Sequence, residues 1–334
     1  MRAAVSEAIY SGISFEDASA EVECARAAGA EVVAFQDPRF PQRLREIYDP
    51  PTLLHARGRT ELLSSDSVAI VGSRRPTPYG TGVAQKFGRE LCRAGLTVVS
   101  GLARGIDSWA HRGVLDAGGG TVAVLGCGAD VVYPKENQKL MADIVDKGLV
   151  VSEFPMGSPS FPQNFPIRNR VISGLSMGVM VVEGAQYSGS LITARLALDQ
   201  GREVFAVPGS IASKASWGPN LLIKQGAKLV QETADILEEL PLAVRQQAAE
   251  RSEESSKNGE TSAPDQASIW QGSASPLGKQ LLSLIRVDSS IHIDKLIRLC
   301  EGRSSASVLA ALSELELFGV VKQLPGKHFV RVWS

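Results

Sequence analysis

One pattern recurs between about Ser67 and Leu240 and limits the folds that the chain can adopt: an apolar run, a glycine-rich turn and a stretch with helical spacing. Runs that are apolar throughout are typical of strands buried on both faces, as in a parallel sheet covered by helices. Their alternation with helices predicts an α/β fold with a Rossmann-like, doubly wound, mostly parallel sheet. The predicted strands lie at 68–71, 96–99, 121–125, 149–151, 179–182 and 204–207.

The composition on either side of this pattern divides the chain into four parts. Residues 1–34 form a short helical segment, in which Ser14-Phe15-Glu16-Asp17 resembles a capping box. Residues 35–240 form the Rossmann-like core. Residues 241–275 are rich in Ser, Gln and charged side chains and hold few apolar ones, which predicts a disordered linker. Residues 276–334 carry three helical stretches and a hairpin with a Pro-Gly turn, which predicts a winged-helix domain.

The overall charge excludes a protein that attracts nucleic acid through a global basic field. The 35 Lys and Arg residues nearly balance 36 Asp and Glu, for a net charge of -1, so a polyanion site must be a local concentration of basic groups. The four cysteines are far apart and lack a CxxC pair, which favours reduced thiols and predicts no metal or cofactor. No apolar run of about 18 residues and no signal peptide occurs. We expect a cytoplasmic protein with no membrane partner.

Ligands of open α/β sheets bind outside the carboxyl ends of the strands. Glycines at these ends let backbone amides approach an anion, and the amino termini of the following helices add positive dipole ends. An anion-binding crevice is therefore predicted. Its candidate residues at the strand ends are Gly72, Ser73, Arg74, Ser100, Gly101, Arg104, Ser188, Gly189 and Ser190.

The segment from Phe165 to Ser176 places two arginines and an asparagine between an aromatic-proline entry and an apolar run. The guanidinium groups of Arg168 and Arg170 and the amide of Asn169 suit phosphates and base edges, and the ring of Phe165 suits base stacking. A helix with merely solvated arginines is the alternative. The neighbouring glycine-rich strand ends favour a nucleic-acid contact.

Motifs for catalysis are lacking in the sequence. It contains no GxxxxGK[ST] phosphate loop, no GxSxG elbow and no HExxH helix. Glu183, at a strand end, is the best single candidate for catalysis, and His111 is better explained as a structural histidine. Because no set of nucleophile, base and orienting group is visible, we predict no catalytic residues and no enzymatic activity.

Several motifs follow one another in a fixed order through the core. They are Ala69-Ile70-Val71-Gly72-Ser73-Arg74, Ser100-Gly101-Leu102-Ala103-Arg104-Gly105-Ile106-Asp107, Tyr133-Pro134, Ser152-Glu153-Phe154-Pro155, the segment 165–176, Ser188-Gly189-Ser190-Leu191-Ile192-Thr193-Ala194 and Val207-Pro208-Gly209-Ser210. In this order they resemble the DNA-processing protein A family, also called Smf. The resemblance covers about 35–240 and extends to the winged helix.

This resemblance implies a protein that binds single-stranded DNA, protects incoming strands and loads the recombinase RecA onto them during natural transformation. It also implies a homodimer whose contacts lie late in the core. The apolar residues available there are Leu221, Leu222, Ile236, Leu237 and Leu240.

Two other functions are compatible with parts of the sequence. Nucleotide phosphoribohydrolases have a similar Rossmann-like architecture, but their Pro-Gly-Gly-x-Gly-Thr motif is absent, and 188–193 stand at the comparable place. A sequence-specific regulator could act through the winged helix. Its third helix, from Ser304 to Phe318, is rich in Ser, Ala, Leu and Glu, whereas a helix that reads the major groove normally presents Arg, Asn or Gln.

Overall fold

A computed structural model describes residues 12, 14–257, 275–287, 290–300 and 302–332. Within these residues the core contains a nine-stranded sheet with the order β1-β2-β6-β5-β4-β3-β7-β8-β9. The seven strands from β6 to β9 in this order pair in parallel, whereas β1 and β2 are antiparallel to their neighbours. The strands are β1 (Glu31–Ala34), β2 (Leu53–Gly58), β3 (Ser67–Val71), β4 (Thr97–Ser100), β5 (Thr121–Val124), β6 (Leu149–Ser152), β7 (Gly178–Val181), β8 (Glu203–Ala206) and β9 (Lys228–Leu229).

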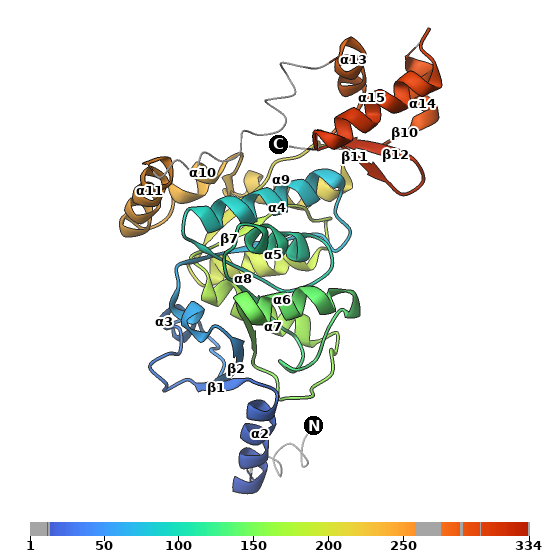
Figure 1. The fold of residues 1–334 in the computed structure, drawn as a ribbon. Coiled ribbons are helices and arrows are strands. Elements are labelled where there is room, and N and C mark those ends of the chain that lie inside the picture. Colours follow the sequence, from blue (N-terminus) through green and yellow to red (C-terminus); the bar gives the residue numbers. More distant parts are fainter. Residues whose placement is uncertain (1–11, 13, 258–274, 288–289, 301, 333–334) are drawn as a thin grey trace.

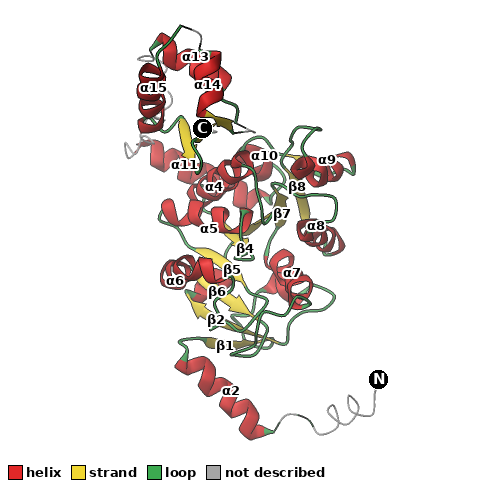
Figure 2. Ribbon diagram, turned by 90° about the vertical axis from the view of Figure 1, so that its right-hand side faces the viewer, coloured by secondary structure: helices red, strands yellow, loops and turns green. Residues whose placement is uncertain are grey.

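Helices cover both faces of this sheet, so the predicted doubly wound fold is confirmed (Figure 1 and Figure 2). In β3, Val68 and Ile70 pack on one face with α4 and α5, and Ala69 and Val71 pack on the other with α7 and α8. Full burial of each large apolar side chain stabilises the fold by about 1.5–3 kcal/mol. The helices are α3 (Gln42–Arg45), α4 (Pro78–Arg93), α5 (Ile106–Asp116), α6 (Gln138–Lys147), α7 (Asn164–Leu175), α8 (Gly189–Asp199), α9 (Trp217–Lys224) and α10 (Thr233–Leu237).

The start of the predicted linker is helical. Helix α11 spans Leu242–Lys257, and Val244 and Ala248 on one face of it are buried. Val244 joins the same apolar cluster as Ile236 and Leu240, so α11 continues the core. Val244 and Ala248 stand four residues apart, so they lie on the same face of the helix and attach it to the core. The polar composition of the surrounding residues hid this pair in the sequence. Residues 258–274 of the linker lie outside the described residues.

Three of the residues predicted for the dimer contact are buried in the protomer itself. Leu222 packs in the cluster under α7 and α8, and Ile236 and Leu240 pack in the cluster under α4 and α5. These side chains already cover the sheet, so they are not available at a surface. Leu221 and Leu237 are partly exposed and remain candidates.

The segment with the predicted capping box begins helix α2 (Phe15–Ala27), where Ser14 is the N-cap and its side chain accepts a hydrogen bond from the Asp17 backbone N–H. The predicted boundary at 34 falls after β1, which already belongs to the sheet. The run is only four residues long and Val33 alone is buried, which explains why this edge strand was missed.

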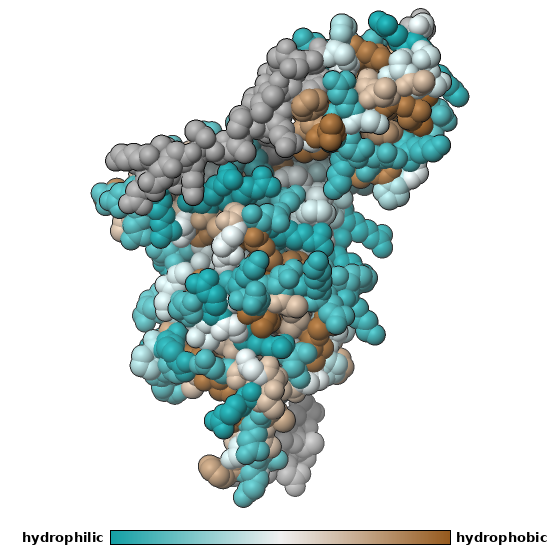
Figure 3. Space-filling model, in the orientation of Figure 1, coloured by the Kyte–Doolittle hydropathy of each residue, from teal (hydrophilic) through white to brown (hydrophobic). Residues whose placement is uncertain are grey.

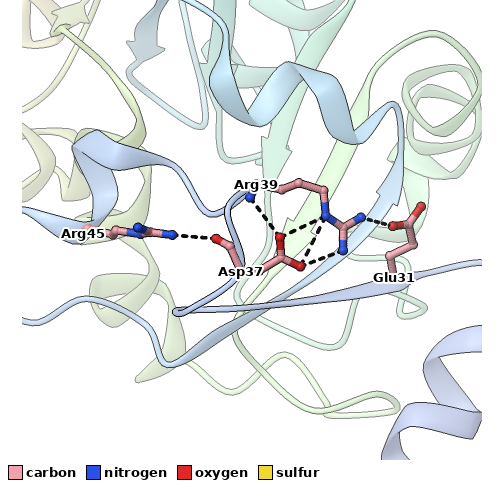
Figure 4. A network of polar contacts seen from close by, with 4 residues as sticks. All are labelled: Glu31, Asp37, Arg39 and Arg45. Atoms are coloured by element: carbon pink, nitrogen blue, oxygen red, sulfur yellow. Dashed lines mark hydrogen bonds and ion pairs between the residues drawn. The ribbon is translucent and has the colours of Figure 1, made fainter.

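A polar network ties the loop after β1 to the strand (Figure 4). The guanidinium of Arg39 pairs with both Asp37 and Glu31, and it lowers the pKa of Asp37 to about 2. The side chain of Arg45 donates to the carbonyl of Asp37 at 2.5 Å, and its guanidinium carbon lies 5.7 Å from the ring centre of Phe40. The two arginines thereby hold the irregular loop against the edge of the sheet.

The carboxyl-terminal part forms a separate apolar core with the predicted winged-helix layout. The structure adds one strand, β10, to the two strands of the predicted hairpin, and the sheet order is β10-β12-β11. The large side chains that meet inside it include Leu281, Leu296, Leu312 and Phe329. Figure 3 shows brown, apolar patches on this domain among the hydrophilic side chains. The elements are α13 (Pro276–Leu284), β10 (Ile291–His292), α14 (Ile293–Leu299), α15 (Ser305–Leu317), β11 (Val321–Leu324) and β12 (His328–Arg331).

Candidate functional site

A cavity lies where the order of the strands reverses. From β3 the chain crosses to β4 on one side, and from β7 it crosses to β8 on the other side, although β3 and β7 are neighbours. Such a reversal opens a crevice at the carboxyl ends of the two strands. A cavity of about 700 Å³ occupies this place. The predicted residues that line it are Gly72, Ser73, Arg74, Phe165, Arg168, Asn169, Ser188, Gly189 and Ser190.

The loop after β3 brings an arginine to this cavity. At Gly72 there is no room for a side chain, because a Cβ atom would lie 2.6 Å from Cγ1 of Ile106. The carbonyl of Ser73 accepts a hydrogen bond of 3.1 Å from the Ile106 N–H, which fixes the loop on the start of α5. The side chain of Arg74 is exposed, with its guanidinium carbon 5.3 Å from the ring centre of Phe165. Arg74 is therefore held over the aromatic wall and remains accessible to an anion.

Glu183 supports the same loop from behind. Its carboxylate accepts hydrogen bonds from the backbone N–H of Thr77 at 2.9 Å and from the Thr77 hydroxyl at 2.5 Å. Thr77 in turn caps α4 by accepting from the Gly80 N–H. Burial raises the pKa of Glu183, and the bonds from Thr77 oppose that rise. This side chain, the sequence's candidate for catalysis, thus anchors the Arg74 loop to α4.

The amino terminus of α8 forms the opposite wall. Ser188 is the capping residue and accepts a hydrogen bond from the Ser190 N–H at 3.4 Å, and the two hydroxyl oxygens are 2.8 Å apart. Gly189 and Ser190, the first residues of the helix, line the cavity. The positive end of an eleven-residue helix therefore faces the same space as Arg74, a combination that favours a bound anion.

Arg168 lines the cavity, and it also makes contacts within the protein that the sequence did not predict. The side chain is only 4% exposed, and Nη1 donates to the carbonyl of Gly101 at 2.7 Å and to that of Val124. Burial lowers the pKa of Arg168 to about 10. Asp107 accepts from the Gly101 and Ala103 N–H groups, and burial raises its pKa against the pull of Arg168. Arg168 and Asp107 together brace the turn after β4.

The second arginine of α7 points away from the cavity. Arg170 makes two hydrogen bonds to Glu153, of 2.6 and 3.0 Å, and a third of 3.1 Å to Asp49. Its guanidinium is mostly buried by these contacts. The prediction that Arg170 contacts a ligand at this site is not supported by its position, because its donors are engaged by carboxylates.

Three further candidates at strand ends do not line the cavity. The hydroxyl of Ser100 is buried and donates to the carbonyl of Ile70 at 2.6 Å. A Cβ atom on Gly101 would lie 2.5 Å from Nη1 of Arg168, so glycine is required there for packing. Arg104 is exposed and pairs with Glu136 at 2.5 Å. These residues shape the surroundings of the site.

Sequence reasoning missed two aromatic residues on the cavity wall. The rings of Tyr133 and Phe165 are 5.4 Å apart at an angle of 36°. Tyr187, between the end of β7 and the cap of α8, also lines the cavity. Tyr187 directly precedes Ser188, a predicted residue of the site, and this position could have identified it from the sequence.

The buried histidine of α5 has a structural partner. Nδ1 of His111 lies 2.8 Å from the Thr121 hydroxyl, and burial lowers the pKa of His111 to about 3. This histidine is therefore neutral at physiological pH. Among the described residues, no group of three or more His, Cys, Asp or Glu side chains could hold a metal ion. No helix in the described ranges is long and apolar enough to cross a membrane.

Comparisons with known proteins match both parts of the chain. The family described as DNA recombination-mediator protein A matches residues 31–241, and the DprA winged helix domain matches residues 261–327. The DNA processing protein DprA of Bacillus subtilis is 46% identical over 65% of this chain and 73% of its own length. Protein Smf of Escherichia coli is 41% identical over 86% of this chain and 74% of its own length.

Two solved structures share the fold and much of the sequence. DNA processing protein A from Streptococcus pneumoniae is 42% identical, with a TM-score of 0.65 over 69% of this chain and 79% of that one. The protein from Helicobacter pylori, described for its single-stranded DNA binding mode, is 31% identical, with a TM-score of 0.57 over 63% of this chain and 95% of that one. The chain belongs to the DprA/Smf family of DNA-processing recombination mediators.

Proposed function

We propose that this chain binds single-stranded DNA in the cavity between β3 and β7 and acts as a recombination mediator without enzymatic activity. The observation that carries the proposal is the meeting of exposed Arg74 with the amino terminus of α8 in one cavity. The Helicobacter pylori relative, described for binding single-stranded DNA, supports the choice of ligand. Because these groups suit phosphates, binding should tolerate any sequence and weaken as salt rises.

The family relationship supports the wider role. As part of the same proposal, the protein acts in the cytoplasm, protects incoming strands during natural transformation and loads RecA onto them. We also propose a homodimer formed through the late part of the core, with Leu221 and Leu237 as its remaining candidates. RecA loading predicts that the protein speeds the formation of RecA filaments on strands that carry a single-strand-binding protein.

The alternatives fit the side chains less well. A phosphoribohydrolase needs a free catalytic carboxylate, whereas both carboxylate oxygens of Glu183 accept hydrogen bonds from Thr77. A groove-reading regulator needs polar side chains on its recognition helix. Helix α15 contains no Arg, Lys, Asn or Gln between Ser305 and Leu317. Release of free base from a nucleoside monophosphate would restore the enzyme, and preference for one duplex sequence would restore the regulator.

The decisive experiment compares Arg74→Ala with the wild-type protein by fluorescence anisotropy on several oligonucleotides of different sequence. A charge-assisted contact contributes about 1.5–3 kcal/mol, so we expect at least a roughly tenfold loss of affinity on every sequence. Arg59→Ala is the matched control. Arg59 is a partly exposed arginine just after β2. The end of β2 pairs with the start of β6, so Arg59 lies near the amino ends of the parallel strands, whereas the cavity lies at their carboxyl ends. Equal affinities of Arg74→Ala and wild type at moderate salt would exclude this cavity.

A further inference from the structure

Aromatic rings surround the proposed phosphate site, but they are not equally available to a base. The ring of Phe165 has a crowded environment: the guanidinium carbons of Arg74 and Arg168 lie 5.3 and 5.9 Å from its centre. The centre of the Tyr133 ring lies 5.4 Å from the centre of the Phe165 ring. A Cβ atom on Gly126 would come within 3.1 Å of the Phe165 ring. Most of the surface of Phe165 is therefore used inside the protein.

Tyr187 has the opposite environment. It is 92% exposed, it lines the same cavity as Arg74, and its ring makes no stacking or cation contact within the described residues. An apolar ring of this size left in water loses the stabilisation that burial gives to other aromatic residues, and a ligand that covers it recovers that stabilisation.

The backbone that carries Tyr187 is fixed on both sides. The Ser188 N–H donates to the carbonyl of Ala185 at 3.0 Å, which makes 185–188 a tight turn with Tyr187 at its third position. Before the turn, Gly184 is held by two backbone hydrogen bonds of 2.7 Å, one to Ala215 and one from Gly218. After the turn, Ser188 caps α8. The ring is thus presented at the mouth of the cavity by a short, anchored loop.

We infer that Tyr187 is a stacking platform for a nucleobase of the single-stranded DNA whose phosphate is held by Arg74. The inference rests on the proposed function and extends it by assigning the base contact to Tyr187, in place of the packed Phe165. A nucleotide carries a charged phosphate and an aromatic base. Arg74 can bind the phosphate and Tyr187 can stack on the base, and both residues line the same cavity. Stacking involves the face of the base, so this contact does not select a sequence.

The test measures the affinity of Tyr187→Ala, Tyr187→Phe and wild type for a labelled oligothymidylate and for an oligonucleotide of equal length made of abasic sites. We expect Tyr187→Ala to bind oligothymidylate about tenfold more weakly, and Tyr187→Phe to bind like wild type because the ring remains. On the abasic strand, all three should bind equally, because no base is there to stack. Tyr48→Ala is the matched control, since Tyr48 is also fully exposed but does not line the cavity.

The outcomes separate this inference from the proposed function. If Arg74→Ala weakens binding while Tyr187→Ala binds oligothymidylate like wild type, the stacking role is wrong and the proposed function stands. An equal loss for Tyr187→Ala on both strands would also refute stacking, since the ring would then act on the backbone or on the loop. If wild type binds neither strand, the proposed function and the stacking role both fail.

Discussion

Replacement of Arg168 with alanine distinguishes a residue that stabilises the fold from one that binds the ligand. Nη1 of Arg168 donates to the carbonyls of Gly101 and Val124, so this nitrogen is engaged within the protein. Asp107 nearby is buried, and Arg168 partly compensates its charge. We therefore expect the alanine variant to lose stability first, with any loss of DNA binding following from the distorted loop.

The size of the loss follows from the contacts that are removed. Two buried carbonyls would lose a charged donor, at about 1–3 kcal/mol each. Removing one partner from a buried ionic cluster costs about 3–5 kcal/mol, and these contributions overlap. We expect the free energy of unfolding to fall by about 3–5 kcal/mol. For a domain of this size, that corresponds to a fall in Tm of roughly 10 °C.

Urea unfolding followed by circular dichroism measures this change, and anisotropy at a temperature where the variant is folded measures binding. Arg168→Lys should lose less, because an ammonium keeps the charge but cannot reproduce the planar guanidinium. Arg74→Ala is the comparison variant, and we expect it to unfold like wild type and to bind more weakly. If Arg168→Ala unfolds at the wild-type urea concentration but has lost binding, Arg168 contacts DNA and the structural assignment is refuted.

The remaining predictions concern the anchor of the loop and the dimer. Glu183→Ala should destabilise the core by about 2–4 kcal/mol, because Thr77 loses an acceptor for two donors. Burial raises the pKa of Glu183 in the folded state. Protonated Glu183 therefore stabilises the fold at low pH, and this contribution is lost as the pH rises through the folded-state pKa. Thermal denaturation of Glu183→Gln should show a weaker dependence on pH. Light scattering at micromolar concentration should show a dimer that Leu237→Lys dissociates and that Leu317→Lys, on the winged helix, leaves intact. A dimer that survives Leu237→Lys would exclude this contact.

The sheet was predictable because its strands are buried on both faces. Each predicted apolar run forms a parallel strand, and β3 shows why: residues 68–71 alternate between two apolar clusters, so neither side of this run faces solvent. The amino-terminal edge strand β1 has no such signal. Helix α11 was missed for a related reason, since two small apolar residues suffice to attach it, and they stand among charged side chains.

The place of the cavity was also predictable, because glycine-rich turns at the strand ends are local features. The direction of each arginine was not. Arg168 and Arg170 are two residues apart on α7, yet one donates to backbone carbonyls below the cavity and the other to Glu153. Which partner a long guanidinium reaches depends on strands that are far away in sequence. Residue type therefore predicted the chemistry of this helix but not its targets.

These assignments change how the cavity should hold a polyanion. Of its two lining arginines, Arg74 is exposed, whereas Arg168 is buried next to Asp107 and uses Nη1 within the fold. A site with few accessible cations cannot rely on charge alone, because each neutralised phosphate of a single strand contributes only about 0.7 to the slope of log affinity against log salt. The remaining attraction must come from uncharged groups. The start of α8 and the ring of Tyr187 supply them, which is why a salt-resistant part of the affinity should depend on the presence of bases.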